Sequence, residues 1–263
     1  MEEWEKFKRN PNRYPTHTDI SSELWFTKVM SSQLANKLDV EAYGKEYMES
    51  LQNIFQYKKK KGYSVVRLEE VTEAIFPGVG PKKEDYIDSN GIPILKTASV
   101  IKVEDRIGII DWSKISFLKK KYAKSNKILK RHDILIQSVA HSKDYIGDKV
   151  AIVDNFPSEY GKILALSKFL VARPDESKVN PNYLYIYLAS KFGQIQYKHY
   201  IRGMTAEIYE FDIKNIWIIL PPKNIQNKIA ENFINTLNEI IKLESNLNQK
   251  KIELKRCLNE VIE

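Results

Sequence analysis

The sequence predicts a mixed α/β (α+β) fold, in which a body built around a small mixed sheet is followed by one long C-terminal helix of the coiled-coil type. Strand-like runs alternate with a helical segment between residues 64 and 222, and apolar residues recur every seven positions from 233 to 261. The length of 263 residues, 43% of them hydrophobic, suits one or two domains with a sizeable core. We therefore expect an N-terminal extension (1–63), the body (64–222) and a pairing helix (223–263).

The composition excludes several classes of protein. No run approaches the roughly 18 consecutive apolar residues of a membrane-spanning helix, and the N-terminal MEEWEKFKRN lacks the apolar core of a secretory signal. The single cysteine, Cys257, excludes a disulfide framework and a cysteine-rich zinc site. We expect a cytoplasmic protein. Its net charge of +8, with most of the excess in residues 64–222, favours a polyanionic partner over a membrane surface.

One amphipathic helix is expected in the N-terminal extension, over residues 39–57. Its apolar positions share one helical face, and they are Tyr43, Tyr47, Leu51, Ile54 and Phe55. Asp39 is a suitable N-cap, and the lysine run 58–61 before Gly62 suits a helix C-terminus. We interpret this lysine run as a solvated helix end, with phosphate contact as the alternative.

The body contains several strand-like stretches and one helical segment. The strand-like stretches are YSVVRLEEV, GIPILKTASVIKV, RIGIIDW, HDILIQSVA, KVAIVDNF, KFLVARP and IKNIWIILPP. The helical segment is NPNYLYIYLASKFGQIQYKHY, which begins with Asn180 as the cap and Pro181 in the first turn.

The C-terminal segment carries a strict heptad pattern that predicts pairing with another helix. The repeating positions are Phe233, Ile240, Leu247, Leu254 and Val261. An antiparallel pair brings Glu244 and Lys251 of the two helices together, whereas a parallel pair opposes like charges. The alternatives are a helix that folds back on its own domain and pairing with the 39–57 helix.

No pattern in the sequence predicts a catalytic site. The NPNY segment has Asn182 where the base-flipping loop of amino-methyltransferases has proline, and PDESK fuses acids that a nuclease metal site takes from separate strands. The histidines show no helical zinc spacing, and they are His17, His132, His141 and His199. We therefore predict a protein that is not an enzyme, with no metal and no cofactor.

A cation-rich segment predicts contact with nucleic-acid phosphates. Its cations are Lys114, Lys119, Lys120, Lys121, Lys124, Lys127, Lys130 and Arg131, without an acidic residue between them. A thinner second cluster contains Lys198, His199, Tyr200 and Arg202, with Gly203 and Thr205 beside it. A solvated basic face is the alternative for both clusters.

Three stretches resemble a known family. They are VVRLEEVTEAIFPGVGPKKEDYIDSNGIPILKTASV, KILKRHDILIQSVAHSKDYIGDKVAIV, and VNPNYLYIYLASKFGQIQ with RGMTAEIYEFDIKNIWIILPPKNIQNKIAENF. Together with LDVEAYGKEY they resemble one half of the DNA-specificity subunit of type I restriction-modification systems, over about residues 38–263. The Leu-Pro-Pro run followed by Gln226 is the most specific feature, and His132 stands where the family usually has glycine.

The resemblance implies a target recognition domain followed by a spacer helix, in a subunit that reads double-stranded DNA and takes no part in catalysis. Family members usually carry two such halves, which two modification subunits bind, and a restriction subunit completes the system. One half is found here, so we expect a homodimer through the C-terminal helix. Base reading is expected from Gln137, Ser138, His141 and Thr205. The alternatives are a protein–protein scaffold with a basic surface and a specificity component of a type II methyltransferase-nuclease.

Overall fold

A computed structural model describes residues 45–154, 156–201 and 206–260. The start of the expected 39–57 helix, with Asp39 and Tyr43, lies outside the described residues, as do Arg202, Thr205 and Val261. The described helices are α2 (Lys45–Lys61), α3 (Pro181–Ala189), α4 (Lys191–Tyr200), α5 (Glu210–Ile213) and α6 (Lys223–Glu260). Of these, none is long and apolar enough to cross a membrane.

A six-stranded sheet forms the centre of the body, with the strand order β2-β12-β8-β10-β6-β5. Its strands are β2 (Thr72–Pro77), β5 (Val100–Glu104), β6 (Ile107–Ile110), β8 (Ile134–Gln137), β10 (Val150–Ile152) and β12 (Phe169–Pro174). The β10–β6 pair is parallel, and the other neighbours are antiparallel. The sheet is therefore mixed, in agreement with the predicted fold class.

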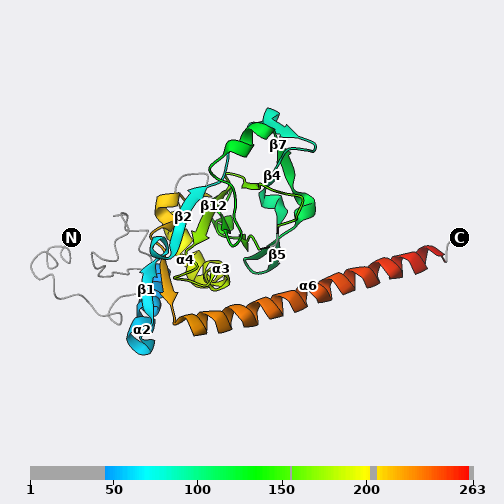
Figure 1. Cartoon of the computed structure of the whole chain (residues 1–263). Coiled ribbons are helices and arrows are strands. Elements are labelled where there is room, and N and C mark those ends of the chain that lie inside the picture. Colours follow the sequence, from blue (N-terminus) through cyan, green and yellow to red (C-terminus); the bar gives the residue numbers. More distant parts are fainter. Residues whose placement is uncertain (1–44, 155, 202–205, 261–263) are drawn as a thin grey trace, which may run out of the picture.

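The central strands are buried on both faces because their side chains alternate between two cores. In β8, Ile134 and Ile136 pack with α2, α3 and α4, whereas Leu135 packs in a second core. In β12, Leu170 and Val171 divide between the same two cores. Helices thus cover one face of the sheet, and a second sheet covers the other (Figure 1).

The covering sheet has four strands in the order β11-β4-β7-β3. They are β3 (Tyr86–Ile87), β4 (Ile92–Leu95), β7 (Ser116–Leu118) and β11 (Leu164–Ala165). Two 3₁₀ turns adjoin this sheet, η4 (Lys83–Asp85) before β3 and η7 (Lys120–Lys124) after β7. We call this sheet with η4 and η7 the distal lobe, because it projects away from α2 and α6 in Figure 1. Short turns join the other strands, and they are η3 (Leu68–Val71), η5 (Thr97–Ser99), η6 (Trp112–Lys114) and η8 (Lys143–Tyr145).

The segment from 180 to 200 forms two helices rather than one continuous helix. Ser190 adopts an extended conformation (φ −72°, ψ 169°) between α3 and α4. A Cβ atom on Gly193 would lie 2.3 Å from the carbonyl oxygen of Leu188, so only glycine allows this close turn. Asn180 begins α3 as predicted, since its side chain accepts a hydrogen bond from the Tyr183 N–H at 3.0 Å.

Two short strand pairs complete the body. β1 (Ser64–Arg67) pairs with β14 (Trp217–Leu220), and β9 (Val139–Ala140) pairs with β13 (Ala206–Glu207), both antiparallel. The Arg67 guanidinium lies 3.5 Å from the centre of the Trp217 ring. This contact joins the first strand of the body in chain order, β1, to the last one, β14.

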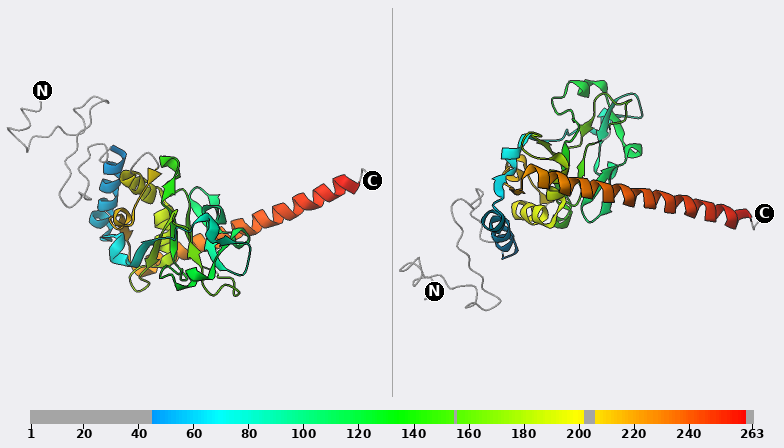
Figure 2. Two further views of the ribbon diagram at one scale, coloured as in Figure 1. Left: turned by 90° about the horizontal axis from the view of Figure 1, so that it is seen from above. Right: turned by 60° about the horizontal axis from the view of Figure 1, so that its bottom comes forward.

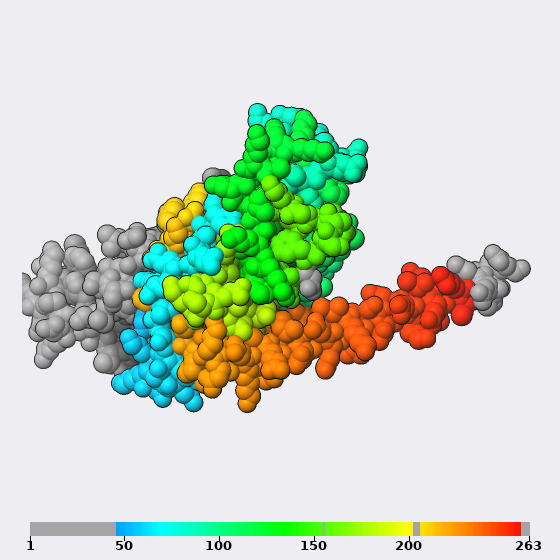
Figure 3. Space-filling model, in the orientation of Figure 1, coloured from blue at the N-terminus to red at the C-terminus, as the bar shows by residue number. Residues whose placement is uncertain are grey.

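α6 begins directly after Pro221 and Pro222 and runs past the body. Its 38 residues correspond to about 57 Å at about 1.5 Å per residue. Figures 2 and 3 show that its first part lies against the body, whereas its C-terminal part extends beyond it.

Candidate nucleic-acid interface

The eight cations of the segment 114–131 follow the chain from the distal lobe to the central sheet. Lys119, Lys120, Lys121 and Lys124 lie on or beside η7, whereas Lys130 and Arg131 precede β8. Lys127 is half-buried, and its ammonium donates to the Gly78 carbonyl oxygen at 3.2 Å. The segment therefore does not form a single basic surface.

Some of these cations are neutralised by acids from elsewhere in the sequence. Lys114 pairs with Asp111 at 3.2 Å, Lys121 with Asp85 at 2.5 Å, and Arg131 with Asp154 at 3.0 Å. Besides Lys130, which precedes β8, three other lysines of the segment are exposed and have no carboxylate partner for their side chains among the described residues. They are Lys119, Lys120 and Lys124.

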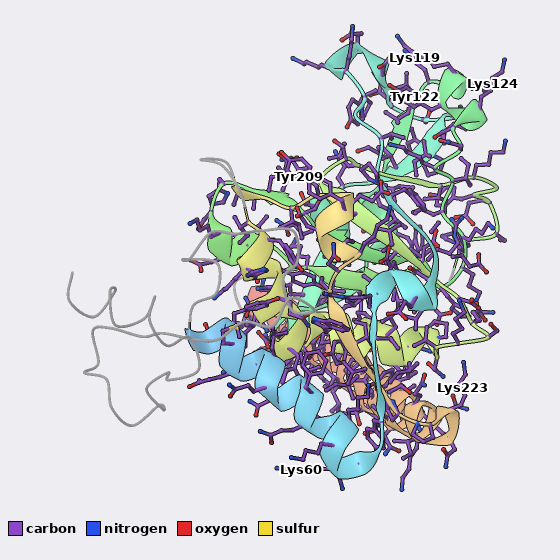
Figure 4. The ribbon with its side chains drawn as sticks, turned by 90° about the vertical axis from the view of Figure 1, so that its left-hand side faces the viewer. Lys60, Lys119, Tyr122, Lys124, Tyr209 and Lys223 are labelled. Atoms are coloured by element: carbon purple, nitrogen blue, oxygen red, sulfur yellow. The ribbon has the colours of Figure 1, made fainter. Side chains whose placement is uncertain are left out.

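These lysines share the tip of the distal lobe with a second lysine pair. Lys82 and Lys83 are exposed at η4, and η4 lies beside η7 because the main-chain N–H of Lys119 donates to the Asp85 carbonyl oxygen at 3.0 Å. We define the distal basic surface as Lys82, Lys83, Lys119, Lys120, Lys121 and Lys124. Figure 4 shows Lys119 and Lys124 at one end of the molecule, and Glu84 is an exposed acid within the same surface.

Asp85 holds the two turns of this surface together. Its buried carboxylate accepts hydrogen bonds from the Tyr122 hydroxyl at 2.8 Å and from the Lys82 N–H at 3.1 Å, besides the ion pair with Lys121. The bond from Lys121, followed by that from Tyr122, lowers the pKa of Asp85 to about 2. Sequence reasoning missed Asp85, since a partner so distant along the chain leaves no local pattern.

The base of the cation-rich segment is anchored by a buried ion pair. The guanidinium of Arg173 on β12 donates to both oxygens of Asp133, at 2.8 Å each, and the Lys130 N–H donates to the same carboxylate at 2.8 Å. This bidentate pair fixes where the segment leaves the distal lobe and enters β8.

Of the residues expected to read bases, Gln137, Ser138 and His141 lie on β8 and the segments that follow it, outside the two turns of the distal basic surface. Ser138 is 2% exposed, and its hydroxyl donates to the Lys168 carbonyl oxygen at 3.2 Å, so its expected surface role is wrong in this conformation. Gln137 is half-buried at the end of β8. His141 is exposed, with its ring 4.8 Å from that of Tyr145.

The second predicted cluster is described only as far as Tyr200, and its His199 and Tyr200 are buried instead of lying at the surface. Lys198 is exposed in the last turn of α4, and Arg202 and Thr205 lie outside the described residues. Nearby, the exposed rings of Tyr209 and Phe211 stack at 5.6 Å. Figure 4 places Tyr209 between Lys119 and Lys60 along the molecule, which separates this region from both lysine-rich ends.

The heptad residues of α6 divide into two groups. Phe233 is half-buried, and its ring contacts that of Tyr185 within the same chain, at 5.9 Å between centres. Ile240 is half-buried. Leu247 and Leu254 are 55% and 61% exposed, and they remain available for pairing.

The described residues contain no group of His, Cys, Asp and Glu side chains that could hold a metal ion. The sequence profile of the type I restriction modification DNA specificity domain matches residues 60–254, which include the last two residues of α2, the whole body and most of α6. This chain belongs to that family. The match places the distal basic surface and all but the last six residues of α6 within one specificity domain.

Solved structures with similar chains include proteins of restriction-modification systems. A chain from a study of the assembly and conformational transition of the type I R-M system shares 19% identity, with a TM-score of 0.48, over 80% of this chain and 50% of that chain. The HsdS subunit from Thermoanaerobacter tengcongensis shares 21% identity, with a TM-score of 0.49, over 71% and 46%. The S subunit of a type I system from M. genitalium shares 14%, with a TM-score of 0.44, over 67% and 39%.

This specificity-domain chain spans half or less of the length of those chains. No curated protein matches it.

Proposed function

We propose that this protein is a sequence-specific double-stranded DNA-binding subunit of a restriction-modification system. It has no catalytic step of its own and directs partner methyltransferase and nuclease subunits to their target. Its membership of the DNA specificity domain family, over the body and most of α6, is the observation that carries the proposal.

The distal basic surface is proposed to contact DNA phosphates. Its lysines project from two turns that Asp85 holds together, and Lys119, Lys120 and Lys124 have no carboxylate partner among the described residues. Cations that are already paired gain less from a phosphate, because they must first leave their own carboxylate. We therefore assign more of the phosphate contact to these three lysines than to the paired Lys121, and the same holds for Lys82 and Lys83, which also have no carboxylate partner among the described residues.

Replacing Lys119, Lys120 and Lys124 together by Ala tests this surface. Each phosphate contact that is lost reduces the slope of log affinity against log salt by about 0.9, so the slope falls by up to about three. Affinity for all duplex sequences should fall together, by roughly tenfold or more at about 0.1 M salt. Fluorescence anisotropy with labelled duplexes over a salt series measures both quantities.

The chain offers a matched control at its other end. Lys58, Lys59 and Lys60 are exposed on the last turns of α2, and Figure 4 shows Lys60 at the end of the molecule opposite Lys119. Their triple replacement by Ala removes the same charge but should leave the slope unchanged. Equal losses in both variants would show that only net charge matters and would refute the assignment of the surface.

We also propose that two copies pair through α6 in an antiparallel arrangement. Leu243, Leu247, Leu254 and Leu258 are exposed beyond the body, and burial of a leucine side chain contributes roughly 1.5–3 kcal/mol. Antiparallel pairing places Glu244 and Lys251 of the two copies in attractive contact, and it sets the two recognition domains at opposite ends of the paired helices.

A further inference from the structure

The first turn of α6 is tied to the body by a buried glutamine. Gln226 is 2% exposed, and its Oε1 accepts a hydrogen bond from the Asn180 N–H at 2.8 Å. Its Nε2 donates to the Pro221 carbonyl oxygen at 2.7 Å. One side chain therefore joins the N-cap of α3, the chain leaving β14 and the start of α6. We call this arrangement the Gln226 clasp.

The two hydrogen bonds of the Gln226 side chain favour one orientation of α6 relative to the body, which packing alone would not specify. An apolar side chain of similar length could occupy the same volume, but the Asn180 N–H and the Pro221 carbonyl would then lose their partners. Leaving buried polar groups without partners costs more than a hydrogen bond contributes, so the folded chain favours the orientation in which both bonds form. Asn227 occupies the next position of α6, and its Oδ1 accepts an exposed hydrogen bond from the Asn180 Nδ2 at 2.9 Å. A variant at Asn227 therefore serves as a comparison for the variants at the buried Gln226.

A small change of direction at the clasp is magnified at the end of α6. Contact with the body continues through Ala230 and Leu237, which are buried, to Ile241, which is half-buried, and residues 242–258 are all exposed. From Gln226 to Leu258 the helix spans about 48 Å at about 1.5 Å per residue. A rotation of about 10° therefore moves its far end by roughly 8 Å, which exceeds two base-pair steps of about 3.4 Å.

We propose that Gln226 is a positioning residue that sets the direction of α6 relative to the recognition body, and thereby the spacing of two DNA half-sites. The inference rests on the proposed function, since a spacing exists only where two copies read one DNA. Gln226 itself touches no DNA in this account. Its loss should broaden the range of accepted spacings and leave the sequence of each half-site unchanged.

The direction of α6 can be measured without DNA and without a dimer. Cys257 is exposed near the end of α6 and is the only cysteine of the chain, so one spin label is placed there and a second at Asp88→Cys, in an exposed turn of the distal lobe. The full-length chain with Leu247→Asp and Leu254→Asp restricts the measurement to distances within one copy. Pulsed electron paramagnetic resonance then gives the distance distribution between the two labels.

Gln226→Met should broaden this distribution by several ångströms, whereas Asn227→Ala should leave it as narrow as in the parent. If the methionine variant does not fold, Gln226→Glu replaces it, because glutamate keeps the acceptor for Asn180 and loses only the donor to Pro221. An unchanged width in a folded Gln226 variant overturns the positioning role, whatever the protein binds.

The effect on spacing is measured by selection of bound duplexes from a random pool. Wild type and Asn227→Ala should enrich one spacing, and Gln226→Met should enrich the same half-site sequence at spacings spread over two or more base pairs. A single, unchanged spacing with Gln226→Met contradicts the inference. If wild type enriches no sequence, the proposed function fails instead, and the label distances still decide whether the clasp directs α6.

Discussion

Asp85 is the residue on which the shape of the distal basic surface depends. Its carboxylate receives Lys121, Tyr122 and the Lys82 N–H, so it joins η4 to η7 and limits how far the neighbouring lysines can move. The ion pair with Asp85 neutralises the positive charge of Lys121, but it holds the turns that carry the neighbouring exposed lysines in place. The positive charge of the distal basic surface therefore comes from its exposed lysines, whereas Asp85 fixes the arrangement of the two turns that carry them.

The titration of Asp85 tests this arrangement. Its pKa of about 2 lies below the ordinary value of the unfolded chain, so ionised Asp85 stabilises the folded state above about pH 4, and this contribution is lost as the pH falls toward 2. Carbon-detected NMR of the carboxylate should give a midpoint near 2 in wild type. Lys121→Met should raise the midpoint toward the ordinary value, and Lys120→Met serves as the control that leaves it unchanged. A wild-type midpoint near 4 would rule out the ion pair in solution.

The burial of Ser138 could be predicted from the local sequence pattern alone. It follows β8 directly and continues the alternation of Ile134 and Ile136, so the period of two already places it on the same buried face. Ser138 was nevertheless expected to contact bases because its side chain is polar. The partners of Asp85, in contrast, follow from the pairing of β3 with β7, which no local pattern reveals.

Among the elements, α6 is the one whose sequence and structure agree most closely. Its seam of small or apolar residues begins against α3 and continues beyond the body, where the same face presents Leu247 and Leu254 to solvent. Periodicity predicted the helix but could not show where its contact with the body ends. The α3–α4 break was missed for a related reason, because helical spacing persists across Ser190, and only the close approach of Gly193 to Leu188 marks the turn.

The exposed stripe of α6 predicts the oligomeric state. Leu247→Asp with Leu254→Asp places charges in the paired face and should convert a dimer to a monomer. Ile252 is 54% exposed but lies on the opposite side of the helix, so Ile252→Asp is the matched control and should remain dimeric. Multi-angle light scattering at tens of micromolar protein distinguishes the two masses. A wild type that is monomeric under these conditions would contradict pairing of two copies, and the exposed stripe of α6 would then bind a different protein.

At the scale of the whole molecule, function is divided between the body and α6. The distal lobe carries the lysines that we propose to contact phosphates, and the Gln226 clasp connects the body to a helix that extends beyond it (Figure 1). Composition and the cation-rich segment predicted the class of partner. The position of the basic surface could not be predicted, because it depends on how the covering sheet folds over the central one.

Selection of duplexes from a random pool by the wild-type protein tests whether two paired copies of this protein read DNA sequence. Two antiparallel copies present the same recognition body in opposite directions, so the enriched DNA should contain two inverted copies of one short sequence at a fixed separation. Enrichment of a single unrepeated site would contradict pairing through α6. No enrichment of any sequence, with binding that depends on salt alone, would contradict the proposal that this protein reads DNA sequence.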